Sequence, residues 1–209
     1  MPYTLFGNPG WGSAIVEAQL AWYEQDCTME EVGDLFASAP ARERLRALNP
    51  VAQVPTLILP DGSVMTESAA ITLHLADVTG SDSLAPGAAD PVRPRFLRWL
   101  VFLVANIYPT FTFADDPSRF VADPEAQKAF RTAVDDYRKS LWESVEREAA
   151  GEWFLGRFSA LDIYVGVMTC WHPRRAWFAE HCPRIHAIAL RAESEPRLAA
   201  TWRRNFPQD

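Results

Sequence analysis

The segment between residues 49 and 68 contains backbone and side-chain groups that could hold a ligand. Pro55 has no N–H group and stands immediately before an apolar run, residues 56–59, that is typical of a strand. A proline at a strand entrance leaves neighbouring backbone groups unpaired, so those of Val54 can pair with an extended ligand as an open sheet edge does. Glu67 and Ser68 begin an apolar helical pattern, and the free N–H groups at a helix start suit a carboxylate. These groups predict a receptor for a small acidic peptide.

The same residues resemble the glutathione signature of the cytosolic, bacterial glutathione S-transferase family. Val54 and Pro55 are followed about a dozen residues later by Glu67 and Ser68, and the resemblance covers most of the chain. It implies that Pro55 follows a cis peptide bond and that Val54 pairs with the cysteinyl backbone of glutathione. It also implies that Glu67 and Ser68 hold the γ-glutamyl end. A hairpin with a turn proline and a serine helix cap is the alternative, because each half of the signature is common by itself.

The elements around this segment change character near residue 80. Before it, short apolar runs alternate with helical patterns; after a turn-rich stretch, the apolar residues recur at three- and four-residue steps. The expected fold class is α/β plus all-α: a thioredoxin-like domain at residues 1–80, a linker at 81–91 and a helical bundle domain at 92–209. The expected strands are 3–6, 28–32, 56–59 and 64–65, and the expected helices of the first domain are 13–23, 41–48 and 67–78.

Two patterns define the helical domain. An apolar stripe beginning at Leu97 stops around Pro109, which predicts a helix end there. Ser159 and Asp162 form a predicted capping box at the start of a later helix, and the same box opens a buried helix throughout the transferase family.

Composition excludes several classes of protein. With 209 residues, of which 48% are hydrophobic, the chain can fill a real core, and its formal charge of −7 opposes binding to nucleic acid or anionic membranes. No apolar run reaches the roughly eighteen residues of a membrane helix, and the first residues lack the basic start of a signal peptide, so we expect a cytoplasmic protein. The three cysteines include no Cys-x-x-Cys pair and are expected to be reduced thiols.

Glutathione chemistry needs the thiol to become a thiolate, because the thiolate is the nucleophile. A hydroxyl or amide donor near a helix start can stabilise it, and the loop at residues 7–13 is where such a donor must lie. Ser13 is the first candidate and Asn8 the second. Two alternatives stay open: Ser13 can cap the helix, and Asn8 can form a turn beside Pro9.

The start of the chain resembles the bacterial beta class of the family, which has a cysteine at the position of Gly12. That cysteine is absent here, which argues against a mixed-disulfide mechanism and favours activation by Ser13. Classes that use serine commonly place an arginine a few residues into the helix, where this chain has Glu17.

Other residues are expected to complete the substrate sites. Gln53 matches the polar residue that the family uses for the glycyl carboxylate, while the loop at 33–40 offers no cation, so Arg42 or a partner subunit is the remaining source. Trp11, Tyr108 and Phe111 are expected to bind the electrophile, and Tyr108 aligns roughly with a beta-class histidine that faces the substrate. Such aromatic surroundings suit a hydrophobic compound.

No metal site is expected. Two cysteines and three histidines gather between residues 170 and 186, but their spacings do not resemble paired zinc ligands.

The sequence therefore predicts a glutathione transferase of the detoxification type, with glutathione as co-substrate, that works as a cytoplasmic homodimer. The alternative is a transferase-like protein that binds glutathione or apolar ligands with little turnover.

Overall fold

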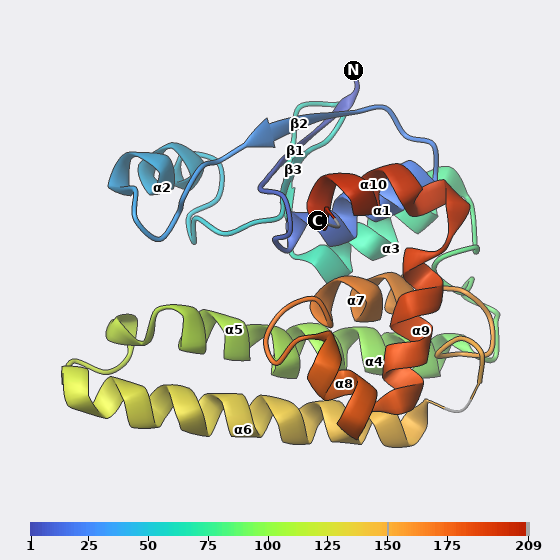
Figure 1. Cartoon of the computed structure of the whole chain (residues 1–209). Coiled ribbons are helices and arrows are strands. Elements are labelled where there is room, and N and C mark those ends of the chain that lie inside the picture. The colour runs from blue at the N-terminus through green and yellow to red at the C-terminus, as the bar shows by residue number, and fades with distance from the viewer. Residues whose placement is uncertain (150, 208–209) are drawn as a thin grey trace.

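The N-terminal half of the computed structural model is a four-stranded sheet with helices on both faces (Figure 1). The structure describes residues 1–149 and 151–207. The strand order is β2-β1-β3-β4, with β2 parallel to β1 and the other pairs antiparallel. The elements are β1 (Tyr3–Gly7), α1 (Ser13–Trp22), β2 (Cys27–Glu31), α2 (Ala39–Arg46), β3 (Thr56–Ile58), β4 (Val64–Thr66) and α3 (Ser68–Thr79). This βαβαββα order confirms the predicted thioredoxin-like fold.

The two faces of the sheet have separate apolar clusters, because successive strand residues point to opposite sides. On one face, Leu5 of β1 pairs with Leu57 of β3, and both are buried under α1 and α3. On the other face, Phe6 packs with the cluster around Leu45 of α2. Figure 1 shows α1 and α3 between the sheet and the rest of the chain, and α2 on the far side.

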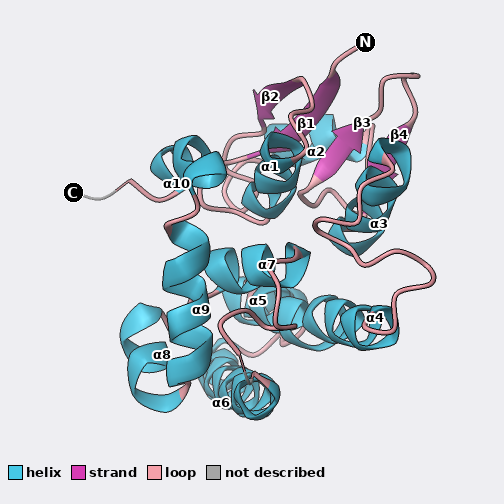
Figure 2. Cartoon of the chain, turned by 90° about the vertical axis from the view of Figure 1, so that its right-hand side faces the viewer, coloured by secondary structure: helices cyan, strands magenta, loops and turns pink. Residues whose placement is uncertain are grey.

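In the C-terminal half, which follows α3, the described residues form helices joined by loops and no strands (Figure 2). They are α4 (Arg93–Phe102), η1 (Leu103–Ile107), α5 (Tyr108–Asp115), η2 (Pro117–Arg119), α6 (Pro124–Glu148), α7 (Ala160–Met168), α8 (Arg175–His181), α9 (Pro183–Glu193), η3 (Pro196–Leu198) and α10 (Ala199–Asn205). Helix α10 returns to the N-terminal half and lies beside α1.

The helix that begins at Arg93 does not end near Pro109, so that prediction is wrong. A π-helical turn, η1, leads directly into α5, and Pro109 stands in the first turn of α5. A missing N–H is tolerated in a first turn, where no α-helical partner is needed, and the π-helical turn shifts the hydrogen-bond pattern just ahead of it. Helix α5 carries Tyr108 and Phe111, two of the residues predicted to bind the electrophile.

The prediction that no apolar run reaches the length of a membrane helix fails here. By length and composition, the stretch from Arg93 to Asp115 is apolar enough to cross a membrane, with a mean hydropathy of 1.3. Core helices pass the same test. Here Phe96, Trp99 and Ile107 are buried in the same apolar cluster as Trp142 of α6 and Ile163 of α7.

Helix α7 lies at the centre of that cluster, and all nine of its residues are buried. The predicted capping box opens it: the Asp162 carboxylate accepts from the Ser159 N–H at 2.8 Å and also from the Phe154 N–H at 2.8 Å. Residues of α1 and α3, among them Ile15 and Ala76, belong to the same cluster. The two halves thus share one core, and the division at residues 81–91 stays a prediction.

Candidate functional site

The β3–β4 hairpin brings the two halves of the signature together. Thr56 pairs with Thr66, so the residues before β3 and after β4 leave the hairpin at the same end. The Val54–Pro55 peptide bond is cis, as the resemblance implies. The Val54 carbonyl oxygen lies 3.4 Å from the point that a Cβ atom at Gly12 would occupy, which adds the start of α1 to this place.

Glu67 stands at the start of α3 in a backbone conformation that residues other than glycine rarely adopt. Its φ is 65° and its ψ 102°. Such a residue costs about 1–3 kcal/mol and persists where the surroundings over-determine it, which is common at ligand sites. Glu67 is exposed and is itself the N-cap residue, without a side-chain capping bond. The alternative in which Ser68 serves as the helix cap is therefore wrong. Ser68 is buried; burial raises the pKa of Tyr164 to about 12, and the Ser68 hydroxyl acts to lower that pKa.

The Ser13 hydroxyl is buried beneath the loop at residues 7–13. It donates to the Asn8 carbonyl and accepts from the Asn8 N–H, both at 3.2 Å. A Cβ atom built on Gly7 would lie 2.1 Å from the Ser13 side chain, so Ser13 packs against the end of β1. The N-cap residue of α1 is Gly12, and the helix-cap alternative for Ser13 is therefore wrong. Its role as thiol activator stays a prediction, but its hydrogen-bonding groups already have partners.

The Asn8 amide is also committed to backbone partners. Its Nδ2 donates to the Gly33 carbonyl at 2.7 Å, and its Oδ1 accepts from the Gly33 N–H at 3.3 Å. Asn8 thereby joins the loop after β1 to the loop after β2.

Trp11 packs on the α2 side of the site. Its ring lies 5.4 Å from that of Phe36, and it contacts the cluster that contains Leu35 and Leu45. Its role in binding the electrophile stays a prediction.

Tyr108 and Phe111 form an aromatic wall with Trp171, which the sequence did not single out. The ring centroids of Tyr108 and Trp171 are 5.5 Å apart and those of Phe111 and Trp171 are 5.0 Å apart, both edge to face. The Trp171 indole N–H donates to the Gly10 carbonyl at 2.7 Å. The aromatic wall is therefore fastened to the loop that precedes α1.

The Tyr108 hydroxyl lies at the start of α1. It lies 1.9 Å from the point that a Cβ atom at Gly12 would occupy. Its oxygen is buried and has no hydrogen-bond partner within the described part of the chain. Burial raises the pKa of Tyr108, and the nearby Tyr164 and Glu67 add to the rise. The hydroxyl therefore keeps its proton and remains a donor.

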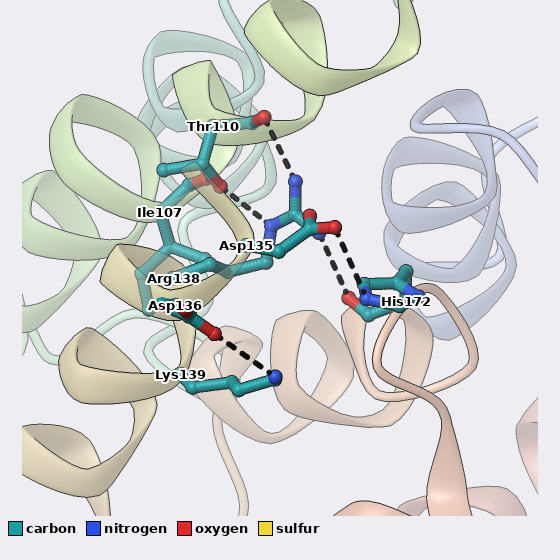
Figure 3. Close-up of polar contacts among 7 residues, drawn as sticks. All are labelled: Ile107, Thr110, Asp135, Asp136, Arg138, Lys139 and His172. Atoms are coloured by element: carbon teal, nitrogen blue, oxygen red, sulfur yellow. Dashed lines mark hydrogen bonds and ion pairs between the residues drawn. The ribbon is translucent and has the colours of Figure 1, made fainter. Parts of the chain in front are cut away.

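The buried Arg138 contacts Phe111 of the aromatic wall. Figure 3 shows its polar contacts with Thr110, Asp135 and His172. The Arg138 guanidinium lies 4.1 Å from the Phe111 ring centroid, in a cation–π contact. Its Nε donates to the Thr110 hydroxyl at 2.7 Å and its Nη2 to the Thr110 carbonyl at 2.8 Å. Its Nη1 donates to Asp135 at 2.9 Å and to the His172 carbonyl at 3.4 Å. Arg138 thus links α5, α6 and the turn after Trp171.

A second link joins α10 to the loop. The Asn205 Oδ1 accepts from the Gly10 N–H at 3.1 Å, and its Nδ2 donates to Glu17 at 2.9 Å. Glu17 also pairs with Arg204 at 3.2 Å. This network explains an acidic residue in α1 without a role toward sulfur.

The chain is 38% identical over 203 residues to the uncharacterized GST-like protein YncG of Escherichia coli (strain K12), covering 96% of this chain and 97% of that protein. The chain belongs to the glutathione S-transferase family. A family model for the glutathione S-transferase N-terminal domain matches residues 19–78. The chain is also 27% identical over 202 residues to the glutathione S-transferase GstA of Escherichia coli O157:H7, covering 96% of this chain and 90% of that one.

Among solved structures, this transferase-family chain resembles a sphingomonad glutathione S-transferase complexed with glutathione. The TM-score is 0.77 and the sequence identity 28%, with 95% of this chain and 96% of that chain covered. The homologue was thus solved with the ligand that the signature predicts.

The beta class has a cysteine at the position of Gly12, and none of the three cysteines of this transferase-family protein provides a thiolate in its place. Cys27, Cys170 and Cys182 are all unpaired. Burial raises the pKa of Cys27 to about 11 and that of Cys182 to about 12, and it raises the pKa of Cys170 as well. These thiols stay protonated at neutral pH.

The sources of charge for the glycyl carboxylate are limited. Arg42 uses its guanidinium to hold the carbonyls of Leu35 at 2.8 Å and Phe36 at 2.9 Å. Gln53 is exposed, while its own carbonyl accepts from Asn49 and Thr56 inside the loop. Gln53 remains the candidate for this end of glutathione.

The cysteines and histidines near the C-terminus have ordinary partners. His181 stacks on Trp177, and Arg175 donates to the Cys170 sulfur at 3.3 Å. Over residues 1–149 and 151–207, no three or more metal-binding side chains converge on one point.

Four residues of the site escaped the sequence interpretation: Tyr164, Trp171, Arg138 and Asn205. Arg138 had a detectable signal, because it is a charged residue on the buried side of α6 beside Leu141 and Val145. The other three are separated from the signature by about a hundred residues or more along the chain, and nothing local marks them.

Proposed function

We propose that this protein is a glutathione transferase that activates the thiol of glutathione for attack on a small hydrophobic electrophile. Glutathione would extend along the Val54 backbone, with its γ-glutamyl ammonium at Glu67 and its γ-glutamyl carboxylate at the start of α3 beside Ser68. The thiol proton passes to solvent. The sulfur then forms a bond to the electrophilic carbon, and the leaving group departs with its electron pair.

One observation carries this proposal: the Val54 carbonyl, the Glu67–Ser68 helix start and the start of α1 converge at one end of the β3–β4 hairpin. The aromatic wall of Tyr108, Phe111 and Trp171 stands over this place and supports a hydrophobic second substrate.

Calorimetric titration with glutathione, followed by an absorbance assay with a chromogenic chlorodinitrobenzene, tests the proposal. We expect saturable binding and turnover. Ser68→Ala should weaken glutathione binding, whereas Ser63→Ala, at the opposite end of the same hairpin, should not. Absence of binding to the unmodified protein would contradict the proposal.

A second candidate function is glutathione binding without useful turnover. It is favoured by the engagement of both the Ser13 hydroxyl and the Asn8 amide with backbone partners. A bound glutathione whose thiol pKa equals that of the free tripeptide would support this second function.

We further propose that the protein works in the cytoplasm as a homodimer, with 81–91 as a linker between two domains. Sedimentation equilibrium tests the assembly. A concentration-independent mass near 23.5 kDa would contradict the dimer.

A further inference from the structure

The Tyr108 hydroxyl is a buried donor whose hydrogen bond is unmade. The ring is partly exposed, yet its oxygen has no contact with solvent and no acceptor within the ranges that the structure describes. Leaving a buried polar group unpaired is unfavourable, so an acceptor that reaches this oxygen gains from the bond.

The position of this hydroxyl is defined by Gly12. The backbone of Gly12 has φ −59° and ψ −20°, a conformation open to any residue, so glycine is not required there by the chain path. What excludes a side chain is the Tyr108 oxygen, 1.9 Å from the ideal Cβ position, with the Val54 carbonyl 3.4 Å from the same point. Tyr108 therefore fills the volume beside Val54 that a side chain of the loop would otherwise enter.

We propose that Tyr108, reaching across from the helical half, donates the hydrogen bond that stabilises the thiolate of glutathione. This inference rests on the proposed function, in which the cysteinyl backbone of glutathione pairs with Val54. The thiol proton passes to bulk water, and Tyr108 keeps its own proton throughout, because burial and the neighbouring Glu67 carboxylate both favour the neutral hydroxyl. Tyr108 is thus a donor and not a base.

The rival donors near the site are already engaged. The Ser13 hydroxyl and the Asn8 amide bond to backbone groups of their loops. The Tyr164 hydroxyl lies 3.4 Å from the Thr72 hydroxyl, within hydrogen-bond distance. Among the residues described, the Tyr108 hydroxyl is the buried side-chain donor beside Gly12 that has no hydrogen-bond partner.

The ring of Tyr108 is also held in place. Trp171 and Phe111 contact it edge to face, at centroid distances of 5.5 Å and 6.5 Å, and Trp171 is anchored to Gly10. An oriented donor is worth more to a developing anion than a mobile one, because it is not reorganised when the charge forms.

The experiment measures the ultraviolet absorbance of enzyme-bound thiolate against pH in the unmodified protein, Tyr108→Phe, Tyr23→Phe and Ser13→Ala. We expect Tyr108→Phe to raise the thiol pKa toward that of free glutathione and to lower kcat about tenfold or more, with little change in the Kd of glutathione. Tyr23→Phe is the matched control, because it removes another buried hydroxyl that has no partner within the described residues, at the end of α1 away from Gly12. It should keep the depressed thiol pKa, as should Ser13→Ala.

The outcomes separate the two proposals. A depressed thiol pKa that survives in Tyr108→Phe overturns this inference and leaves the transferase function standing, whereas failure of the unmodified protein to bind glutathione overturns both. If Tyr108→Phe does not fold, ring-fluorinated tyrosine at position 108 replaces it. The more acidic hydroxyl should lower the thiol pKa further, and an unchanged thiol pKa overturns the inference.

Discussion

Adding a methyl group at position 12 should force the Tyr108 hydroxyl out of its place. In Gly12→Ala the new carbon would lie 1.9 Å from that oxygen and 3.0 Å from the ring carbon that bears it. An unstrained carbon–oxygen contact is about 3.4 Å, so the hydroxyl must move by more than about 1 Å. The ring cannot retreat freely, because Phe111 and Trp171 flank it. We expect a loss of about 1–3 kcal/mol in the free energy of unfolding, the usual cost of overpacking.

A double-mutant cycle isolates the steric part of that cost. Gly12 is the N-cap residue of α1, and alanine is a poorer N-cap by a few tenths of a kcal/mol or more, whatever Tyr108 does. In a Tyr108→Leu background only this capping cost should remain, which gives a coupling energy of about 1–2 kcal/mol by urea unfolding. Gly87→Ala is the matched control, because nothing lies within 4 Å of its Cβ position. Additive costs for Gly12→Ala and Tyr108→Leu would refute the contact.

Four further predictions concern the site and its supports. Glu67→Gln should weaken glutathione binding in calorimetry and leave the melting temperature unchanged; unchanged affinity in both Glu67→Gln and Ser68→Ala would mean that glutathione binds elsewhere. Ser13→Ala should cost about 1–2 kcal/mol of stability, because it leaves both backbone groups of Asn8 without their partner, and an unchanged melting temperature would contradict this. Arg138→Met should cost about 2–4 kcal/mol and lower the affinity for apolar electrophiles, since Phe111 and Thr110 lose their support; unchanged binding of the electrophile would argue against a positioning role. In the unfolded chain Tyr108 loses its proton near its ordinary pKa of about 10, whereas the folded protein retains it, so the stability from this group is present below pH 10 and lost above it. The difference in free energy of unfolding between the unmodified protein and Tyr108→Phe should therefore be constant below that pH and change only above it.

Local patterns were sufficient for most of the fold. The helix predicted at 13–23 is observed at Ser13–Trp22, and the strand predicted at 56–59 is Thr56–Ile58. Both depend on periodicity and turn residues that neighbours in sequence supply. The prediction of a helix end at Pro109 failed for a different reason. A proline inside an α-helix normally interrupts it, because proline has no N–H group to donate to the preceding turn. Here the π-helical turn before Pro109 shifts the backbone hydrogen-bond pattern, so the helix continues.

The glutathione signature was visible in the sequence because the hairpin that assembles it is short. Val54 and Glu67 are thirteen positions apart, and antiparallel pairing of two three-residue strands is enough to bring them to one end. The capping box of Ser159 and Asp162 is local in the same way.

The proposed donor to the sulfur could not be found from such patterns. The sequence shows a glycine at position 12 where the beta class has a cysteine, and it directs attention to the neighbouring Ser13. Only the packing of the helical half on the loop reveals that Tyr108, ninety-six positions away, fills the space at Gly12, while Ser13 turns inward to its own backbone. Secondary structure is decided by interactions over a few residues, whereas a buried hydroxyl between two halves of a chain exists only once their apolar faces have joined in one core.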